Sequence, residues 1–146
     1  MKGIEKVGFT GSRREMRPVQ WNKTKDILSL FENMKEFHHG DCIGCDAQAH
    51  ILISKLFPDV KIHIHPPKTE TYRAWCPTNI MHTPEEYIKR NHTIVDEVEI
   101  VVATPKEEQE QQRSGTWSTI RYAQKTKKPL YIIYPNGIFE YQEGKK

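Results

Sequence analysis

Three apolar segments of the chain each end in a glycine-containing turn that leads into a helical pattern. The turns read GFTGSR at residues 8–13, GDCIGCD at residues 40–46 and RSGT at residues 113–116. Apolar segments that alternate with helices are typical of a parallel sheet, because parallel neighbours are joined by crossover connections. The alternation therefore predicts an α/β fold with all three turns at the carboxyl edge of one sheet, where open parallel sheets bind ligands.

Five strand-like segments carry this alternation along the chain, and we expect strands at residues 4–10, 37–40, 60–65, 98–103 and 129–134. Right-handed crossovers between them predict one Rossmann-like domain over residues 1–146, with a doubly wound parallel sheet of about five strands in the order 3-2-1-4-5. Asn136-Gly137 is a strong turn signal, so residues 138–141 are expected to return as a short antiparallel C-terminal strand. In this order the topological switch lies between strands one and four, which brings the first and third turns together.

Helix start signals support the same fold. Pro18 suits the first position of a helix, and the sequence TPEE at residues 83–86 predicts a capping box with proline at the first helical position. Ser114 or Gly115 is expected to start the last helix. The second helix is expected to bury the face formed by Ala47, Ile51, Leu52 and Leu56.

Two connecting segments are long enough to contribute to function. Residues 66–82 have no periodicity but contain Tyr72, Arg73 and Trp75, and such aromatic content argues against disorder. We therefore expect a lid or a partner surface there. Residues 106–112 are polar and rich in glutamine, which predicts a solvated mobile loop or one that closes over a ligand.

Composition and charge exclude several classes of protein. The net charge is +3, and the basic residues form no patch of the kind that a nucleic-acid binder usually has. The three cysteines cannot all pair within one chain, which indicates a reducing compartment rather than a disulfide framework. The first residues lack a signal-peptide core, and no segment approaches the roughly 20 apolar residues of a membrane span. We therefore expect a cytoplasmic protein without membrane contact.

The first and third turns are the best candidates for holding phosphate. A glycine turn before a helix exposes backbone N–H groups beside the positive end of the helix dipole. Ser12 and Arg13 add a hydroxyl and a bidentate cation. The pattern is neither the dinucleotide fingerprint nor a P-loop, which disfavours nicotinamide cofactors and ATP hydrolysis. Each turn also has a structural interpretation, namely a tight turn with an exposed Arg13 and a serine N-cap at Ser114.

Other residues are expected to complete a ligand-binding site between these turns. Arg90 and Asn91 precede the fourth strand and face either the pocket or solvent. Asp46 either binds a ribose hydroxyl or caps its own helix. The complete set of predicted ligand-binding residues is Gly8, Thr10, Gly11, Ser12, Arg13, Gly44, Asp46, Arg90, Asn91, Ser114, Gly115 and Thr116.

A metal or redox interpretation centres on the CxxC motif of Cys42 and Cys45, which lies beside His38 and His39. A structural zinc site normally needs four ligands, and no second CxxC or spaced histidine pair completes one. A thioredoxin-like motif would need a different strand context, and Cys76 has no evident base beside it. We therefore expect no metal and no cofactor.

Four motifs in order resemble the SLOG superfamily, which includes the LOG-type phosphoribohydrolases, the YpsA-like proteins and the DNA-processing protein DprA. They are GFTGSR at residues 8–13, HGDCIGCDAQAH at residues 39–50, Arg90-Asn91, and RSGT at residues 113–116. The second motif is especially close to the DprA pattern. The resemblance spans residues 6–133 and implies a Rossmann-like fold, a pocket for a nucleotide or nucleotide-derived ligand at these turns, and a homo-oligomer.

LOG enzymes cleave the N-glycosidic bond of a nucleoside monophosphate with a glutamate that follows the third motif, and here Ser118 and Thr119 stand at the acidic positions. A carboxylate from Asp41, Asp46 or Glu107 would have to replace it, so the catalytic residues are unknown. The resemblance thus implies a binder of a nucleotide or ADP-ribose-like molecule that senses or sequesters a nucleotide signal. The alternatives are a nucleotide N-glycosidase and a DprA-like module for single-stranded DNA.

Overall fold

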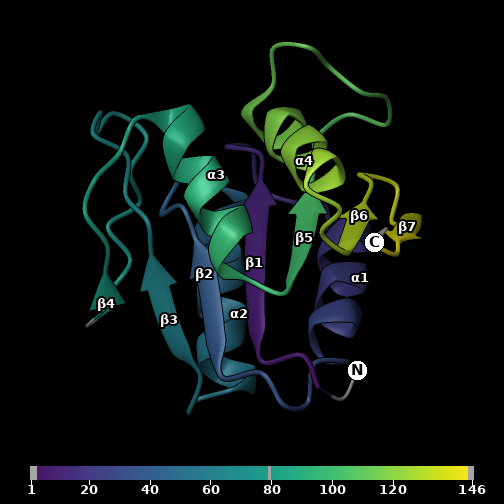
Figure 1. The fold of residues 1–146 in the computed structure, drawn as a ribbon. Coiled ribbons are helices and arrows are strands. Elements are labelled where there is room, and N and C mark those ends of the chain that lie inside the picture. The colour runs from purple at the N-terminus through teal and green to yellow at the C-terminus, as the bar shows by residue number, and fades with distance from the viewer. Residues whose placement is uncertain (1–2, 79, 145–146) are drawn as a thin grey trace.

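The computed structural model describes residues 3–78 and 80–144, and its centre is a seven-stranded sheet (Figure 1). The strands are β1 (Lys6–Gly11), β2 (Glu36–His39), β3 (Lys61–Ile64), β4 (Ile80–Met81), β5 (Ile100–Thr104), β6 (Leu130–Ile133) and β7 (Phe139–Gln142). They lie in the order β4-β3-β2-β1-β5-β6-β7, and each pairs in parallel with its neighbours except β7, which is antiparallel to β6. The sheet is therefore open and mostly parallel, as predicted.

The expected number of strands was wrong, although the predicted segments are ordered as expected. The five predicted strands correspond to β3, β2, β1, β5 and β6 in that spatial order, and the expected antiparallel strand forms as β7. Strand β4 was missed because its two residues lie in a segment without apolar alternation. The sheet therefore has seven strands, and β4 rather than β3 forms one edge.

Helices cover both faces of the sheet. They are α1 (Pro18–Leu28), α2 (Cys45–Leu56), α3 (Tyr87–Glu97) and α4 (Gly115–Lys125). Figure 1 shows α3 and α4 in front of the sheet and α1 and α2 behind it. The alternating side chains of β5 feed both layers, since Val102 packs in the core beneath α1 and α2 while Val101 and Ala103 pack in the core beneath α3 and α4. None of the helices within the described ranges has the length and apolar character needed to cross a membrane.

Two details of the predicted helices were wrong. Helix α2 leaves Ile51 exposed and buries Ala49 and Ile53 together with polar Asp46 and His50. Its buried face is therefore rotated relative to the face predicted from apolar residues alone. Helix α3 begins at Tyr87, after the predicted capping box. The backbone of Glu85 instead bonds to the segment that follows β3, with its N–H donating to the carbonyl of Pro66 at 3.2 Å. This pairing accounts for the later start of the helix.

Candidate ligand-binding site

A cleft of about 740 Å³ opens where the carboxyl ends of β1 and β2 meet α3 and the first turn of α4. Its volume is within the range of small-molecule sites. Ten of the twelve predicted residues line it, namely Thr10, Gly11, Ser12, Arg13, Asp46, Arg90, Asn91, Ser114, Gly115 and Thr116. The structure therefore brings the first and third turns to one cavity, as the predicted topological switch requires.

The remaining two predicted residues, Gly8 and Gly44, lie outside the lining and serve packing. A Cβ atom on Gly8 would lie 2.8 Å from Val98 Cγ2, so this glycine lets α3 approach the sheet closely. Gly44 has a φ of +89°, and a Cβ atom there would collide with the backbone carbonyl of Arg13. The second turn therefore packs directly on the first.

The first turn uses its own hydroxyl internally. Ser12 Oγ donates to the carbonyl of Arg14 at 3.0 Å and accepts from the Arg14 N–H at 2.9 Å. The guanidinium of exposed Arg13 lies 3.9 Å from the ring centroid of Tyr72, a cation–π distance. The N–H of Ser12 donates to the carbonyl of Thr104 at 3.3 Å. The Arg13 side chain, rather than the Ser12 hydroxyl, is therefore the group of this turn that is available to an anion.

The third turn presents an open helix N-terminus. Ser114 is the N-cap of α4, and its Oγ accepts from the N–H of Trp117 at 3.2 Å. The N–H groups of Gly115 and Thr116, in the first turn of the helix, have no intrahelical acceptor. A Cβ atom on Gly115 would meet nothing within 4 Å, so the space beside this helix end is free. Both residues line the cleft, where they can donate to an anion.

The charge of the lining is mainly positive. Besides Arg13 and Arg90, the cations in the wall are Arg14, Lys106 and Arg113, against the carboxyl groups of Asp46 and Glu107. The sequence-predicted site lacks these three cations, although Arg113 belongs to the third turn; Arg14 directly follows the first turn, and Lys106 lies in the polar loop. Several cations around a partly enclosed cavity attract anionic ligands.

Arg90 is a buried wall residue and not a surface one. Its Nη1 donates to the carbonyls of Gly40 at 2.7 Å and His65 at 3.1 Å, and its Nε donates to Asn91 Oδ1 at 2.8 Å. A Cβ atom on Gly40 would lie 2.8 Å from the guanidinium carbon, so this glycine makes room for Arg90. Arg90 therefore ties the ends of β2 and β3 together while it adds positive charge to the cleft.

Asp46 is a buried carboxyl in the wall of the same cleft. Its Oδ2 accepts from the N–H of Cys42 at 3.2 Å, and within the described ranges its Oδ1 has no hydrogen-bond partner. Burial raises the pKa of the Asp46 carboxyl to about 7, although the nearby charge of Arg90 opposes the shift. Near neutral pH this group can thus either donate or accept a hydrogen bond from a ligand hydroxyl.

The segment between β3 and β4 is fixed to the second turn by a buried ion pair. Asp41 Oδ2 accepts from Arg73 Nε at 2.8 Å, and its Oδ1 accepts from the N–H of Cys76 at 2.9 Å. Asp41 has a φ of 57°, a conformation that aspartate tolerates better than most residues. The pair was not predicted, and it holds Tyr72 where this ring lines the cleft beside Arg13.

The CxxC thiols are not activated. Burial raises the pKa of Cys42 and of Cys45 to about 11 each. Reactive thiols of redox motifs have a lowered pKa instead. Cys45 Sγ donates to the carbonyl of Arg14 at 3.2 Å, which indicates that this thiol packs the first turn against α2.

No protein-family model matches the sequence, and no curated protein is similar enough to match it. Solved structures do match. The molybdenum cofactor binding protein of Rippkaea orientalis is 18% identical, with a TM-score of 0.67 over 92% of this chain and 78% of that chain. The single-stranded DNA-binding DNA processing protein A of Helicobacter pylori is 20% identical, with a TM-score of 0.60 over 88% of this chain and 65% of that one.

A third structure, the structural-genomics target TM1055, is 14% identical, with a TM-score of 0.59 over 87% of this chain and 72% of that chain. At such identities the likeness concerns the fold alone. The shared fold is Rossmann-like, as the sequence predicts.

Proposed function

We propose that the cleft binds a phosphorylated nucleotide or nucleotide derivative, such as an ADP-ribose-like molecule, with the phosphate or diphosphate between the first and third turns. The observation that carries this proposal is the open N-terminus of α4, where Gly115 and Thr116 line the same cavity as Arg13. Two proteins with this fold bind a molybdenum cofactor and single-stranded DNA, respectively, which supports a binding role. A nucleotide held in this way would be sensed or sequestered.

The phosphate position follows from backbone groups and charge together. The helix dipole and two unpaired N–H groups favour an anion at the start of α4. Arg13 lines the same cleft, and Arg113, which directly precedes the N-cap Ser114, and Lys106 add positive charge to this lining. A cation pair and a helix N-terminus around one cavity match a phosphate better than an uncharged ligand.

The rest of the ligand has a defined wall to contact. The ring of Tyr72, stacked on the Arg13 guanidinium, offers a flat surface for a base. Asp46, with one oxygen free of protein partners, is suited to a ribose hydroxyl. The volume of about 740 Å³ accommodates a mononucleotide or a somewhat larger derivative.

A nucleotide N-glycosidase is the second candidate, and the position of Asp46 favours it. Two other positions do not supply a carboxylate to the cleft. Thr119, at an acidic position of the LOG motif, donates its hydroxyl to the carbonyl of Gly115 within α4, and Asp41 is held by Arg73 away from the cleft lining. Asp46, however, lines the cleft with a pKa raised by burial to about 7, which suits a general acid or base. A carboxyl at this position could stabilise the charge that develops as the glycosidic bond breaks.

The binding proposal is tested by removing one N–H group while the helix is kept. Gly115 is the first residue of α4, and Ser114 before it has an extended backbone (φ −109°, ψ 131°), so proline is tolerated at position 115. Gly115→Ala is the matched control, because it fills the same open space and retains the N–H group. Isothermal titration with AMP, ADP-ribose and inorganic phosphate should show binding that Gly115→Pro weakens at least tenfold more than Gly115→Ala.

Four further outcomes separate the alternatives. Equal affinity of the two variants for a bound nucleotide would overturn the phosphate position, and no binding of any nucleotide would overturn the proposal itself. Release of free base from nucleoside monophosphates, followed by chromatography and lost in Asp46→Asn, would establish the glycosidase. Tight binding of single-stranded DNA with a steep salt dependence would instead favour the DprA-like function.

A further inference from the structure

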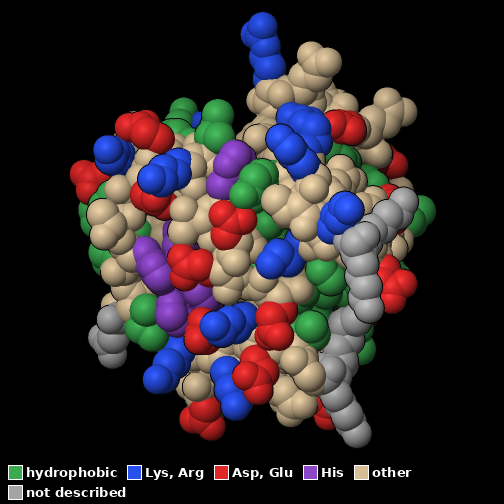
Figure 2. Space-filling model, in the orientation of Figure 1, with side chains coloured by type: hydrophobic (Ala, Val, Ile, Leu, Met, Phe, Trp, Pro, Cys, Tyr) green, Lys and Arg blue, Asp and Glu red, His purple; other side chains and the backbone are tan. Residues whose placement is uncertain are grey.

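Six of the seven histidines gather in two groups at the β2–β3 side of the sheet. Adjacent residues of a strand point to opposite faces, so His38 and His39 belong to different groups. On one face His38 lies with His63, His65 and His82. Figure 2 shows histidine side chains gathered on this face of the molecule, at the left of the view.

The group on the other face is fully hydrogen-bonded by the protein. The N–H of Asp41 donates to His39 Nδ1 at 2.9 Å, so the proton of this ring is on Nε2, which donates to His50 Nδ1 at 2.9 Å. The remaining nitrogen of His50 hydrogen-bonds to the backbone of Pro77. Burial and Asp41 raise the pKa of the neighbouring Cys76 to about 12. This group has no ring lone pair left for a metal, so its role is structural.

The first group differs, because Glu36 determines which ring nitrogens of His38 and His63 carry a proton. Glu36 Oε1 lies 2.8 Å from His38 Nε2 and 3.5 Å from His63 Nε2. A carboxylate only accepts, so His38 carries its proton on Nε2 and its Nδ1 holds a lone pair. This Nδ1 faces His65 Nε2 at 2.8 Å. Likewise His63 Nδ1 faces His82 Nε2 at 3.0 Å, which leaves Nδ1 of His82 without a proton.

The contact with His38 Nδ1 at 2.8 Å places the proton of His65 on its Nε2, because His38 accepts there. The Nδ1 of His65 is buried without a hydrogen-bond partner in the described part of the chain, so the proton can move to Nδ1 when Nε2 binds a metal.

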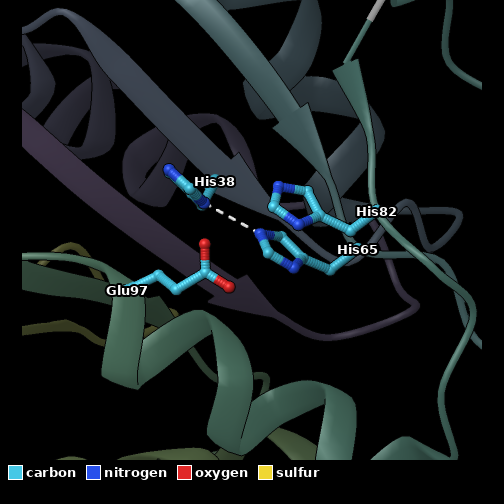
Figure 3. A group of neighbouring side chains, drawn as sticks. All are labelled: His38, His65, His82 and Glu97. Atoms are coloured by element: carbon cyan, nitrogen blue, oxygen red, sulfur yellow. Dashed lines mark hydrogen bonds between the residues drawn. The ribbon is translucent and has the colours of Figure 1, made fainter.

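A carboxylate from helix α3 completes this set of ligands. Glu97 is the last residue of α3, and Figure 3 shows its carboxylate directed toward the facing nitrogens of His38 and His65. His82 stacks on His65 with ring centroids 3.9 Å apart. One ligand atom from each of these four residues lies within 4.8 Å of the others.

We propose that His38, His65, His82 and Glu97 form a binding site for a divalent transition-metal ion of the zinc type. Three imidazoles and one carboxylate are a donor set that zinc prefers over magnesium or calcium. Zinc–nitrogen bonds of about 2.0–2.1 Å place tetrahedral ligands roughly 3.3 Å apart. The 2.8 Å between His38 and His65 therefore has to open by about 0.5 Å on binding.

Glu36 takes a defined part in this site. A histidine that binds a metal through one nitrogen commonly donates its other N–H to a carboxylate, which fixes the ring and its tautomer. The bond between His38 Nε2 and Glu36 has this geometry. Glu36 is therefore a positioning residue, and His63 shares the same carboxylate.

The bound ion would link residues of several elements. Its ligands come from β2, from the residues after β3 and β4, and from the end of α3. The ion would thus fix the two-residue edge strand β4 against the sheet. His65 also accepts from Arg90 through its carbonyl, so the site lies behind the wall of the cleft without using any cleft residue as a ligand.

The experiment is a titration of the full chain with zinc chloride after treatment with a chelator, followed by calorimetry and by thermal unfolding. We expect one equivalent to bind with a dissociation constant of micromolar or below and to raise the melting temperature. Cobalt(II) in place of zinc should give the visible absorption of a tetrahedral site. Glu97→Gln changes an exposed side chain and His82→Ala a half-buried one, and each should weaken zinc binding at least tenfold.

His92→Ala is the matched control, because this seventh histidine stacks on Tyr122 away from the group. Its zinc affinity should equal that of the unmodified chain, and Glu36→Gln should weaken binding about tenfold. The proposal is overturned if the folded chain binds no stoichiometric zinc, or if Glu97→Gln and His82→Ala both bind as tightly as the unmodified chain. Loss of binding in Cys76→Ser alone would also overturn it, since it would place the metal in the other group.

Discussion

The second and third turns share one sequence pattern, but only the third leaves a helix start free to bind an anion. Both lead from a strand into a helix, but the start of α2 is filled by the protein itself, because Asp46 occupies it and the N–H of Cys45 donates to the carbonyl of Ser12. The start of α4 is open beside Gly115. A glycine turn before a helix is therefore an anion site only where no side chain of the protein already occupies it.

The largest expected effect concerns the second turn, the filled one. Asp41→Asn keeps the shape and the left-handed backbone but removes the buried carboxylate partner of Arg73, which keeps only the exposed carboxylate of Glu70 at 3.8 Å. Removal of one partner of a buried ion pair typically costs about 3–5 kcal/mol. Urea unfolding should show a loss of this size, against little change in the control Asp59→Asn on the exposed surface. A loss below about 1 kcal/mol would mean that the ion pair does not organise this turn.

The second prediction uses the pKa of Asp46, which is raised in the folded chain from 3.8 to about 7. An acid with a raised pKa binds more protons when folded, so its contribution to stability is present below about pH 4 and is lost as the pH rises toward 7. The slope reaches about 1.4 kcal/mol per pH unit. Asp46→Asn should remove it, so the variant gains stability relative to the unmodified chain between pH 4 and 7. Parallel curves of unfolding free energy for the two proteins would contradict the shift.

The next prediction concerns the third turn, the open one, and uses the affinity for a nucleotide. Arg13→Ala removes a cation that lines the same cleft as the start of α4. Hydrogen bonds to charged groups contribute about 1.5–3 kcal/mol. We expect a nucleotide to bind roughly 10- to 150-fold more weakly, with its affinity measured by calorimetry. Arg17→Ala is the control, since Arg17 is also exposed but lies outside the cleft lining. Equal effects of the two substitutions would indicate general charge attraction instead of a defined contact.

The sequence predicted what depends on local pattern and missed what depends on side chains from distant segments. The order of the five main strands and the N-cap at Ser114 follow from periodicity and capping chemistry. The pair of Asp41 and Arg73 joins residues 32 positions apart, and no local rule brings them together. The sequence offered signals for it only in hindsight, namely an aspartate after a glycine at the end of a strand and an arginine among aromatic residues.

The histidine group shows the same limit. A search for zinc ligands at short spacings fails, because His38, His65 and His82 come from three neighbouring parallel strands or their ends. What the sequence does show is an alternation in which His63 and His65 must share one face of the sheet. Only the register of β2 with β3, in which His38 lies opposite His63, reveals that His38 joins them.

The smallest expected effect separates the two roles of the third turn. Ser114→Ala removes the acceptor for the Trp117 N–H and should lower the free energy of unfolding by about 1 kcal/mol, the usual cost of losing an N-cap. Gly115 and Thr116 keep their N–H groups, so the affinity for a nucleotide should fall by less than the tenfold expected for Gly115→Pro. Chemical unfolding and calorimetry on the same variant measure the two quantities separately. If affinity falls as steeply as in Gly115→Pro, the Ser114 hydroxyl itself binds the ligand. The third turn would then bind through a side chain and not only through its backbone N–H groups.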